Sequence, residues 1–241
     1  MKFYTPEWYN DTVVSEMYAQ MRKTQSASKY SDKFYEKLRK IELRAFKYHA
    51  KRTAKIMRQK FDAQAAEQQF NANYEENLAF VKANLPDEIL QNVKDIRVLA
   101  LGSADYEVTA QIERFCAKMM KKCRNIESQY EEQLEIVAQS VGWETVNSLD
   151  LLIGSPIESV VNHGNKVVVT TSAELVGVSY KITLSGVSDE SVPQNAQSAI
   201  IHRPELVANG DKLGFGILCF DEESKPLTVE FCAENISIAN A

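Results

Sequence analysis

Apolar residues recur every three or four positions through most of residues 1–141, a spacing that predicts amphipathic helices. The most regular series lies between Gly102 and Gly142 and predicts one long helix. Its apolar positions are Val108, Ile112, Phe115, Met119, Cys123, Ile126, Tyr130, Leu134 and Val137. Because these positions share one face of the helix, we expect Ile112 and Met119 to lie in a core.

A second series runs from about Lys33 to Phe70 without a Gly or Pro. A helix of roughly 38 residues would be about 57 Å long and would need a packing partner along its length. The helix between Gly102 and Gly142 is long enough to be that partner, so we predict an antiparallel hairpin of these two helices. Shorter helices are predicted to begin at Pro6 and Pro86, because proline suits the first turn of a helix.

After Trp143, glycines and β-branched residues replace the helical pattern and predict short strands. The turn sequences Asn162-His163-Gly164-Asn165 and Asn209-Gly210 are typical of β-hairpins. We expect about six or seven strands in an antiparallel sheet or a partly closed barrel. If the last two strands pair in the register that aligns them, their alternating apolar residues would cover one core face: Leu218, Phe220, Leu227, Val229 and Phe231.

The predicted fold class is therefore α+β. An N-terminal long antiparallel helical hairpin with shorter helices occupies residues 1–145, and a small antiparallel β domain occupies residues 146–241.

Composition and charge are those of an ordinary folded protein, with 44% hydrophobic residues and a net charge of −5. No apolar run approaches the roughly 18 residues of a membrane span, and no signal peptide is recognisable at the start. The four cysteines form no C-x-x-C pair, so we expect reduced thiols and a cytoplasmic location.

Short segments at both ends and in the middle of the chain resemble a family of uncharacterised bacterial cytosolic proteins. The similar segments are Lys2-Phe3-Tyr4-Thr5 with Trp8-Tyr9, Asp95–Gly102, Gly210–Phe215 and Leu227–Phe231. Residues 200–205 depart from the aromatic and acidic run that the family would place there. The resemblance implies a fold and supplies no chemistry.

The histidines and glycines predict no catalytic, cofactor or metal site. His49, His163 and His202 lie far apart, and none has a second ligand at a local metal-binding spacing. Gly214-Phe215-Gly216 lacks the residues of a phosphate-binding loop.

Four residues outside the basic segment are weak interaction candidates. Asp95 and Arg97 lie in an otherwise apolar run and could form a small site or a polar clip that anchors the connector. Trp8 and Tyr9 could pin the first helix to the body or form an exposed aromatic binding surface.

Residues 22–60 contain 14 Lys/Arg and three Asp/Glu, a local charge of +11, so the rest of the chain sums to −16. One reading is a solvated face partly neutralised by Glu113, Glu127, Glu131, Glu132 and Glu135 of the predicted partner helix. The others are an acidic protein partner or a nucleic acid. The weak interaction candidates in this segment are Arg44, Lys47, Lys51, Arg52, Lys55 and Arg58.

The leading hypothesis is a non-catalytic protein-interaction protein with no cofactor, a protein partner and no membrane contact. The alternative is a nucleic-acid-associated protein that uses the basic helix 33–60, although we do not expect nucleic acid as the partner. An enzyme with a spatially assembled site is the third hypothesis.

Overall fold

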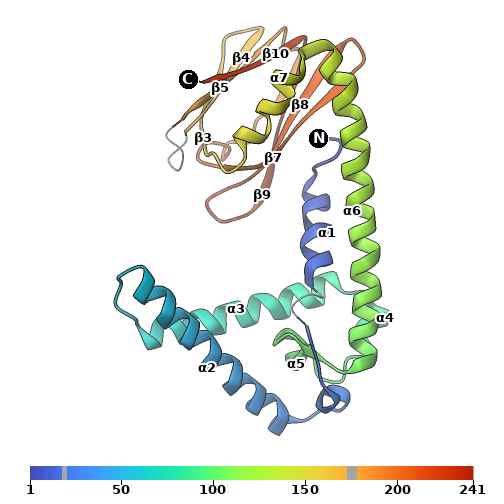
Figure 1. The fold of residues 1–241 in the computed structure, drawn as a ribbon, viewed down its shortest axis with the longest axis vertical. Coiled ribbons are helices and arrows are strands. Elements are labelled where there is room, and N and C mark those ends of the chain that lie inside the picture. Colours follow the sequence, from blue (N-terminus) through green and yellow to red (C-terminus); the bar gives the residue numbers. More distant parts are fainter. Residues whose placement is uncertain (18–20, 173–177, 241) are drawn as a thin grey trace. The chain divides into compact units, whose positions relative to one another are not determined.

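The computed structural model describes residues 1–17, 21–172 and 178–240, and it confirms the α+β class: helices come first and antiparallel sheets follow (Figure 1). The α-helices are α1 (Pro6–Glu16), α2 (Asp32–Ile56), α3 (Ala63–Asn84), α4 (Asp87–Leu90), α5 (Ile96–Ala100), α6 (Tyr106–Val141) and α7 (Trp143–Ser148). Short 3₁₀ helices among the described residues include η2 (Gln25–Ser28) and η3 (Asp150–Leu152). None of the described helices is both long enough and apolar enough to cross a membrane.

The chain forms two compact units. The helical unit is Val13–Met120, and the sheet unit combines Met1–Thr12 with Lys121–Ala241. Residues 106–120 of α6 therefore belong to the helical unit, and residues 121–141 belong to the sheet unit.

The expected continuous helix over residues 33–70 is wrong, because the chain forms two helices there. Ser31 caps α2 by accepting the N–H of Phe34 at 3.2 Å, and α2 ends at Ile56. Asp62 then caps α3, because its carboxylate accepts the N–H groups of Gln64 and Ala65 at 2.8 and 3.0 Å. An N-cap thus interrupts a segment that contains neither Gly nor Pro.

The partner of α2 is α3, and the prediction that it is the helix after Gly102 is wrong. Along α2, Tyr35 packs near Tyr74, Arg39 donates to Asn71 at 2.8 Å, and Lys47 pairs with Glu67 at 2.6 Å. As the residue number increases along α2, the residue number of the contacting side chain on α3 decreases, so the two helices run antiparallel. The long antiparallel hairpin therefore exists, and it is formed by α2 and α3.

The apolar face of α6 is confirmed as a core face. Within the helical unit, Val108, Ile112 and Cys116 are buried against Val81, Leu85, Ile89 and Leu99 of α3, α4 and α5. Ile112 is 0% exposed, whereas Met119 is only partly buried. The same unit holds a short parallel pair of strands, β1 (Arg22–Lys23) and β2 (Ser103–Ala104).

Two four-stranded antiparallel sheets make up most of the sheet unit, in the orders β10-β5-β4-β3 and β6-β9-β8-β7. Their strands are β3 (Ile157–Asn162), β4 (Lys166–Thr171), β5 (Tyr180–Ser185), β6 (Asp189–Ser191), β7 (Ile200–Asn209), β8 (Lys212–Phe220), β9 (Pro226–Ala233) and β10 (Asn235–Asn240). Apolar residues from both sheets share one core, including Val169 and Ile182 from the first and Ile217 and Val229 from the second. The arrangement is two packed sheets and not a partly closed barrel, and it includes β6 and β10, which were not predicted.

Both faces of β8 are buried, and this corrects the predicted core face of the last hairpin. The register pairs Ile217 with Val229 and Phe215 with Phe231, and these residues face the core between the sheets. Leu218 points to the other face, where it packs with aromatic residues of the N-terminal segment and α6. Leu218 and Val229 therefore do not share a face.

The N-terminal segment and the second half of α6 cover that other face of β8. Phe3, Tyr4 and Trp8 are buried with Tyr130 and Leu218. The hydroxyl of Tyr130 also accepts the N–H of Leu206 on the edge strand β7 at 3.1 Å. A backbone N–H group of the edge strand thus has a hydrogen-bond partner, where it would otherwise be unpaired.

We predict that Ile112→Asp lowers the free energy of unfolding by about 4 kcal/mol, because it places an unpaired carboxylate in the core of the helical unit. Ala117→Asp, on an exposed position of the same helix, should cost less than about 1 kcal/mol. Urea titration followed by circular dichroism measures both values. If both variants lose the same small amount of unfolding free energy, the apolar face of α6 is not a core face.

Candidate functional site

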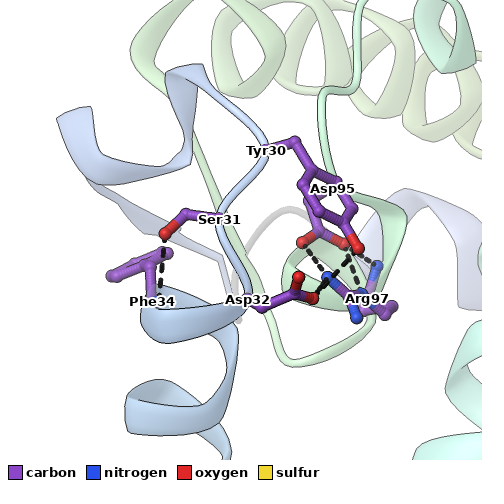
Figure 2. Close-up of polar contacts among 6 residues, drawn as sticks. All are labelled: Tyr30, Ser31, Asp32, Phe34, Asp95 and Arg97. Atoms are coloured by element: carbon purple, nitrogen blue, oxygen red, sulfur yellow. Dashed lines mark hydrogen bonds and ion pairs between the residues drawn. The ribbon is translucent and has the colours of Figure 1, made fainter.

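Asp95 and Arg97 form a polar clip with Asp32 (Figure 2). Asp95 is 5% exposed and caps α5 by accepting the backbone N–H of Arg97 at 3.1 Å. The guanidinium of Arg97 then donates to both carboxylate oxygens of Asp95, from Nε at 2.9 Å and from Nη2 at 2.8 Å. Nη2 also donates to Oδ1 of Asp32 at 2.9 Å, which joins α5 to the first turn of α2.

Two tyrosines flank the clip. The guanidinium of Arg97 lies 4.4 Å from the ring centroid of Tyr35 and 4.8 Å from that of Tyr30, within cation–π range. The Tyr30 hydroxyl donates to Oδ1 of Asp32 at 3.0 Å, as Figure 2 shows. The cation, the two carboxylates and the two rings therefore hold one another in place.

The electrostatics of the clip follow from these contacts. Hydrogen bonds from Arg97 and then Tyr30 lower the pKa of Asp32. Hydrogen bonds to Asp95 and then Asp32 raise the pKa of Arg97, and the bond to Asp32 raises the pKa of Tyr30. All three shifts favour the protonation states that hold the contacts at neutral pH.

The clip offers little room for a ligand. The cavity beside Asp95 has a volume of about 10 Å³, which is about the space of one water molecule. Of the two readings of Asp95 and Arg97, the geometry therefore favours the anchor over the small binding site.

The exposed cations of α2 lie away from α3. Lys47 is the exception among the six predicted basic candidates, because it pairs with Glu67. The other five are exposed and make no ion pair within the described residues. Four of them lie on α2 and the fifth follows its end at Ile56; we call the five the basic face: Arg44, Lys51, Arg52, Lys55 and Arg58.

The expected neutralisation of α2 by the acids of α6 rested on the wrong helix pairing. Helix α3 contributes Glu67, Glu75, Glu76 and Lys82, which cancel little of the charge of residues 22–60. One acid of the expected set, Glu113, lies 3.8 Å from Lys23, which precedes α2. The hairpin therefore leaves the positive charge of the basic face largely uncancelled.

Large apolar side chains are exposed among these cations. Ile41, Tyr48 and Ile56 are 49%, 64% and 74% exposed, and their spacing places them on one broad side of the helix. An open hollow of about 430 Å³ lies on the same outer face, lined by Lys33, Glu36, Lys37, Lys40, Ile41 and Arg44. The outer face of α2 thus combines charge, apolar contact area and a depression.

Trp8 and Tyr9 pack within the sheet unit, which agrees with the anchoring reading. Trp8 is buried. Tyr9 makes edge-to-face contacts with Phe220 and His202, with ring centroids 4.6 Å and 5.1 Å apart. Burial, followed by the nearby positive charge of Arg203, lowers the pKa of His202. The exposed aromatic binding surface is therefore wrong for Trp8.

Sequence reasoning missed Glu205, a carboxylate that is 2% exposed on β7. Its oxygens accept the backbone N–H groups of Lys2, Phe3 and Tyr4 at 2.6, 3.0 and 2.9 Å. The available signal was an acidic residue directly after Pro204 in a strand whose neighbours are apolar. Glu205 fixes the N-terminal segment on the sheet.

A hollow of about 410 Å³ on the same sheet is lined by four carboxylates, three of which have hydrogen-bond or ion-pair partners. Glu205 is bound by backbone N–H groups, Glu230 pairs with the amino group of Met1, and Glu190 accepts from Asn162 at 2.8 Å. Asp189 is the fourth. Within the described residues, no three His, Cys, Asp or Glu side chains gather in a way that could hold a metal ion.

Comparison with models of protein families gives no match for this chain, and comparison with curated proteins gives none either. The resemblance seen in the sequence therefore stays a prediction.

Removing the guanidinium from the clip should destabilise the helical unit. We predict that Arg97→Ala lowers the free energy of unfolding by about 2 to 3 kcal/mol, because the buried carboxylate of Asp95 loses its charged partner. Asp32→Asn, which changes an exposed member of the clip, should leave the melting temperature nearly unchanged. If both variants melt like the wild type in calorimetry, the clip is not an anchor.

The buried carboxylate of Glu205 gives a second test. Glu205→Leu should cost about 3 kcal/mol, because three buried N–H groups lose their acceptor, while Glu205→Gln should retain part of the stability through its amide oxygen. Glu222→Gln, in an exposed turn, is the matched control and should unfold like the wild type. A Glu205→Leu variant with wild-type stability in urea would rule out this role for Glu205.

Proposed function

We propose that this chain is a non-catalytic protein-interaction protein and that the outer face of α2 is its binding surface. The observation that carries this proposal is the pairing of α2 with α3, which leaves the basic face exposed and without ion pairs among the described residues. Exposed cations on a helix attract an acidic surface and raise the rate of encounter with it.

The exposed apolar residues favour a protein over a nucleic acid. A phosphate backbone offers no apolar counterpart for Ile41 or Ile56, whereas protein interfaces have apolar centres surrounded by polar rims. Tyr48 lies between them along the helix and supplies an aromatic side chain of the kind enriched in interfaces.

A nucleic-acid partner is the second candidate, because the basic face lacks the expected neutralising helix. Basic residues that follow one helix face can track a phosphate backbone, and such binding weakens steeply with salt. A cytoplasmic location belongs to the proposal as well. Its support is the burial of three of the four thiols; burial raises the pKa of the Cys219 thiol to about 12.

The test compares two fluorescent probes by anisotropy across a salt series: an acidic helical peptide of Glu and Leu, and a random-sequence DNA duplex. We expect the peptide to bind at least about tenfold more tightly than the duplex, whose dissociation constant should be no lower than roughly 10 μM near physiological salt. Peptide binding should weaken at least about tenfold when glutamine replaces Arg44, Lys51, Arg52 and Lys55.

The matched control removes the same charge from exposed lysines elsewhere: Lys118, Lys121, Lys166 and Lys181 become glutamine. This variant should bind the peptide like the wild type. Sub-micromolar duplex binding with a log–log salt slope of about −4 or steeper, lost only in the α2 variant, would make nucleic acid the better account. Equal peptide binding by all three proteins would contradict the proposal.

A further inference from the structure

Resting on the function proposed above, we propose that the acidic partner of the basic face is a second copy of this chain, bound through the glutamates of α6. The interacting surfaces are the outer face of α2 in one copy and the acidic ridge of α6 in the other. We define the acidic ridge as Glu127, Glu131, Glu132 and Glu135.

The acidic ridge brings like charges close together on one helix. Glu127, Glu131 and Glu135 follow one another at four-residue steps, so they lie above one another on the same side of α6. Glu131 and Glu135 are exposed, and none of the ridge glutamates makes an ion pair within the described residues. Like charges at this spacing destabilise a helix, and an opposing cationic surface would offset that repulsion.

The spacing of the basic face matches the spacing of the ridge. Lys51 and Lys55 are four residues apart, like Glu131 and Glu135, which is about 6 Å along a helix. Arg44 and Arg52 repeat at eight residues, or about 12 Å, and this is the separation between Glu127 and Glu135. Two helices laid side by side can therefore form several ion pairs at once, which favours the contact more than one exposed pair would.

Both surfaces also expose apolar side chains beside their charges. Ile136 is 51% exposed and directly follows Glu135 on α6. On α2, Tyr48 lies one turn from Arg44 and from Arg52. Contact between these apolar groups would exclude water around the ion pairs and strengthen them.

The charge distribution of the chain supplies the driving force. Residues 22–60 sum to +11 and the remainder to −16, so each copy carries both of the complementary surfaces. Such a contact weakens at high salt, because the Debye length falls from about 10 Å at 0.1 M to about 3 Å at 1 M.

Sedimentation velocity of the purified full chain, over a concentration series at low and high salt, is the first test. We expect complexes of at least two chains in about 0.05 M salt, with the dissociation constant raised at least about tenfold in about 0.5 M salt. A single-chain mass up to roughly 100 μM protein at low salt would overturn the proposal, because that limit corresponds to binding weaker than about 5.5 kcal/mol.

Charge reversal on each surface then identifies the contact. One variant carries Lys51→Glu and Lys55→Glu, and the other carries Glu131→Lys and Glu135→Lys. Each variant alone should remain a single chain, because the two reversed residues now face like charges on the other surface and the net attraction between the surfaces falls. An equimolar mixture should associate again, since the reversed α2 residues of one variant complement the reversed ridge residues of the other, and the unreversed α2 and ridge surfaces still complement each other.

Circular dichroism confirms that both variants fold, as expected for exposed positions. Failure of the mixture to associate would contradict the pairing of α2 with the ridge. Reversals that alter the melting temperature while the wild type stays a single chain would indicate a contact within one chain and would also overturn the proposal. The acidic peptide assay separates the two claims: if the peptide still binds the basic face, only the identity of the partner is wrong.

Discussion

The carboxylate of Asp62 accepts the N–H groups of Gln64 and Ala65, and this cap separates α2 from α3. Because the chain reverses there, α3 folds back on α2 and occupies its inner face. Tyr35 and Phe46 on that face then pack near Tyr74 and Phe70 of α3. The outer face of α2, with Ile41, Tyr48 and most of the cations, stays open. The exposed charge on which the proposed function depends is thus a consequence of where one helix starts.

Two buried carboxylates also fix the positions of neighbouring segments through hydrogen bonds. Asp95 directs Arg97 toward α2, so the polar clip fixes the start of the hairpin on α5. Glu205 binds three consecutive backbone N–H groups, so the N-terminal segment covers β8. Each carboxylate is buried only because donors surround it, and an unpaired charge at either position would cost several kcal/mol. These residues stabilise the two units.

Much of the fold could be predicted from periodicity, because apolar spacing reports which face of an element is buried. The helix with its series of apolar positions from Val108 to Val137 and the hairpin at Asn209-Gly210 are both present in the structure. The break at residues 57–62 was not predicted, because Asp62 acts through a side-chain cap that leaves no Gly or Pro signal. The face of Leu218 was also missed, since alternation cannot distinguish two faces that are both buried. The sequence identified the basic candidates as a set. The pairing of Lys47 with Glu67 was not predicted, because it depends on α3 being the packing partner of α2.

Photo-crosslinking from the outer face of α2 tests the central claim most directly. A benzophenone amino acid replaces Tyr48, which is 64% exposed between the cations, and the control carries it at Tyr106, which is 58% exposed on α6. On irradiation in cells, we expect the Tyr48 position to crosslink to protein, with the attachment sites in acidic segments that include residues 127–136 of this chain. Crosslinks to nucleic acid, or the same protein crosslinks from both positions, would contradict the account.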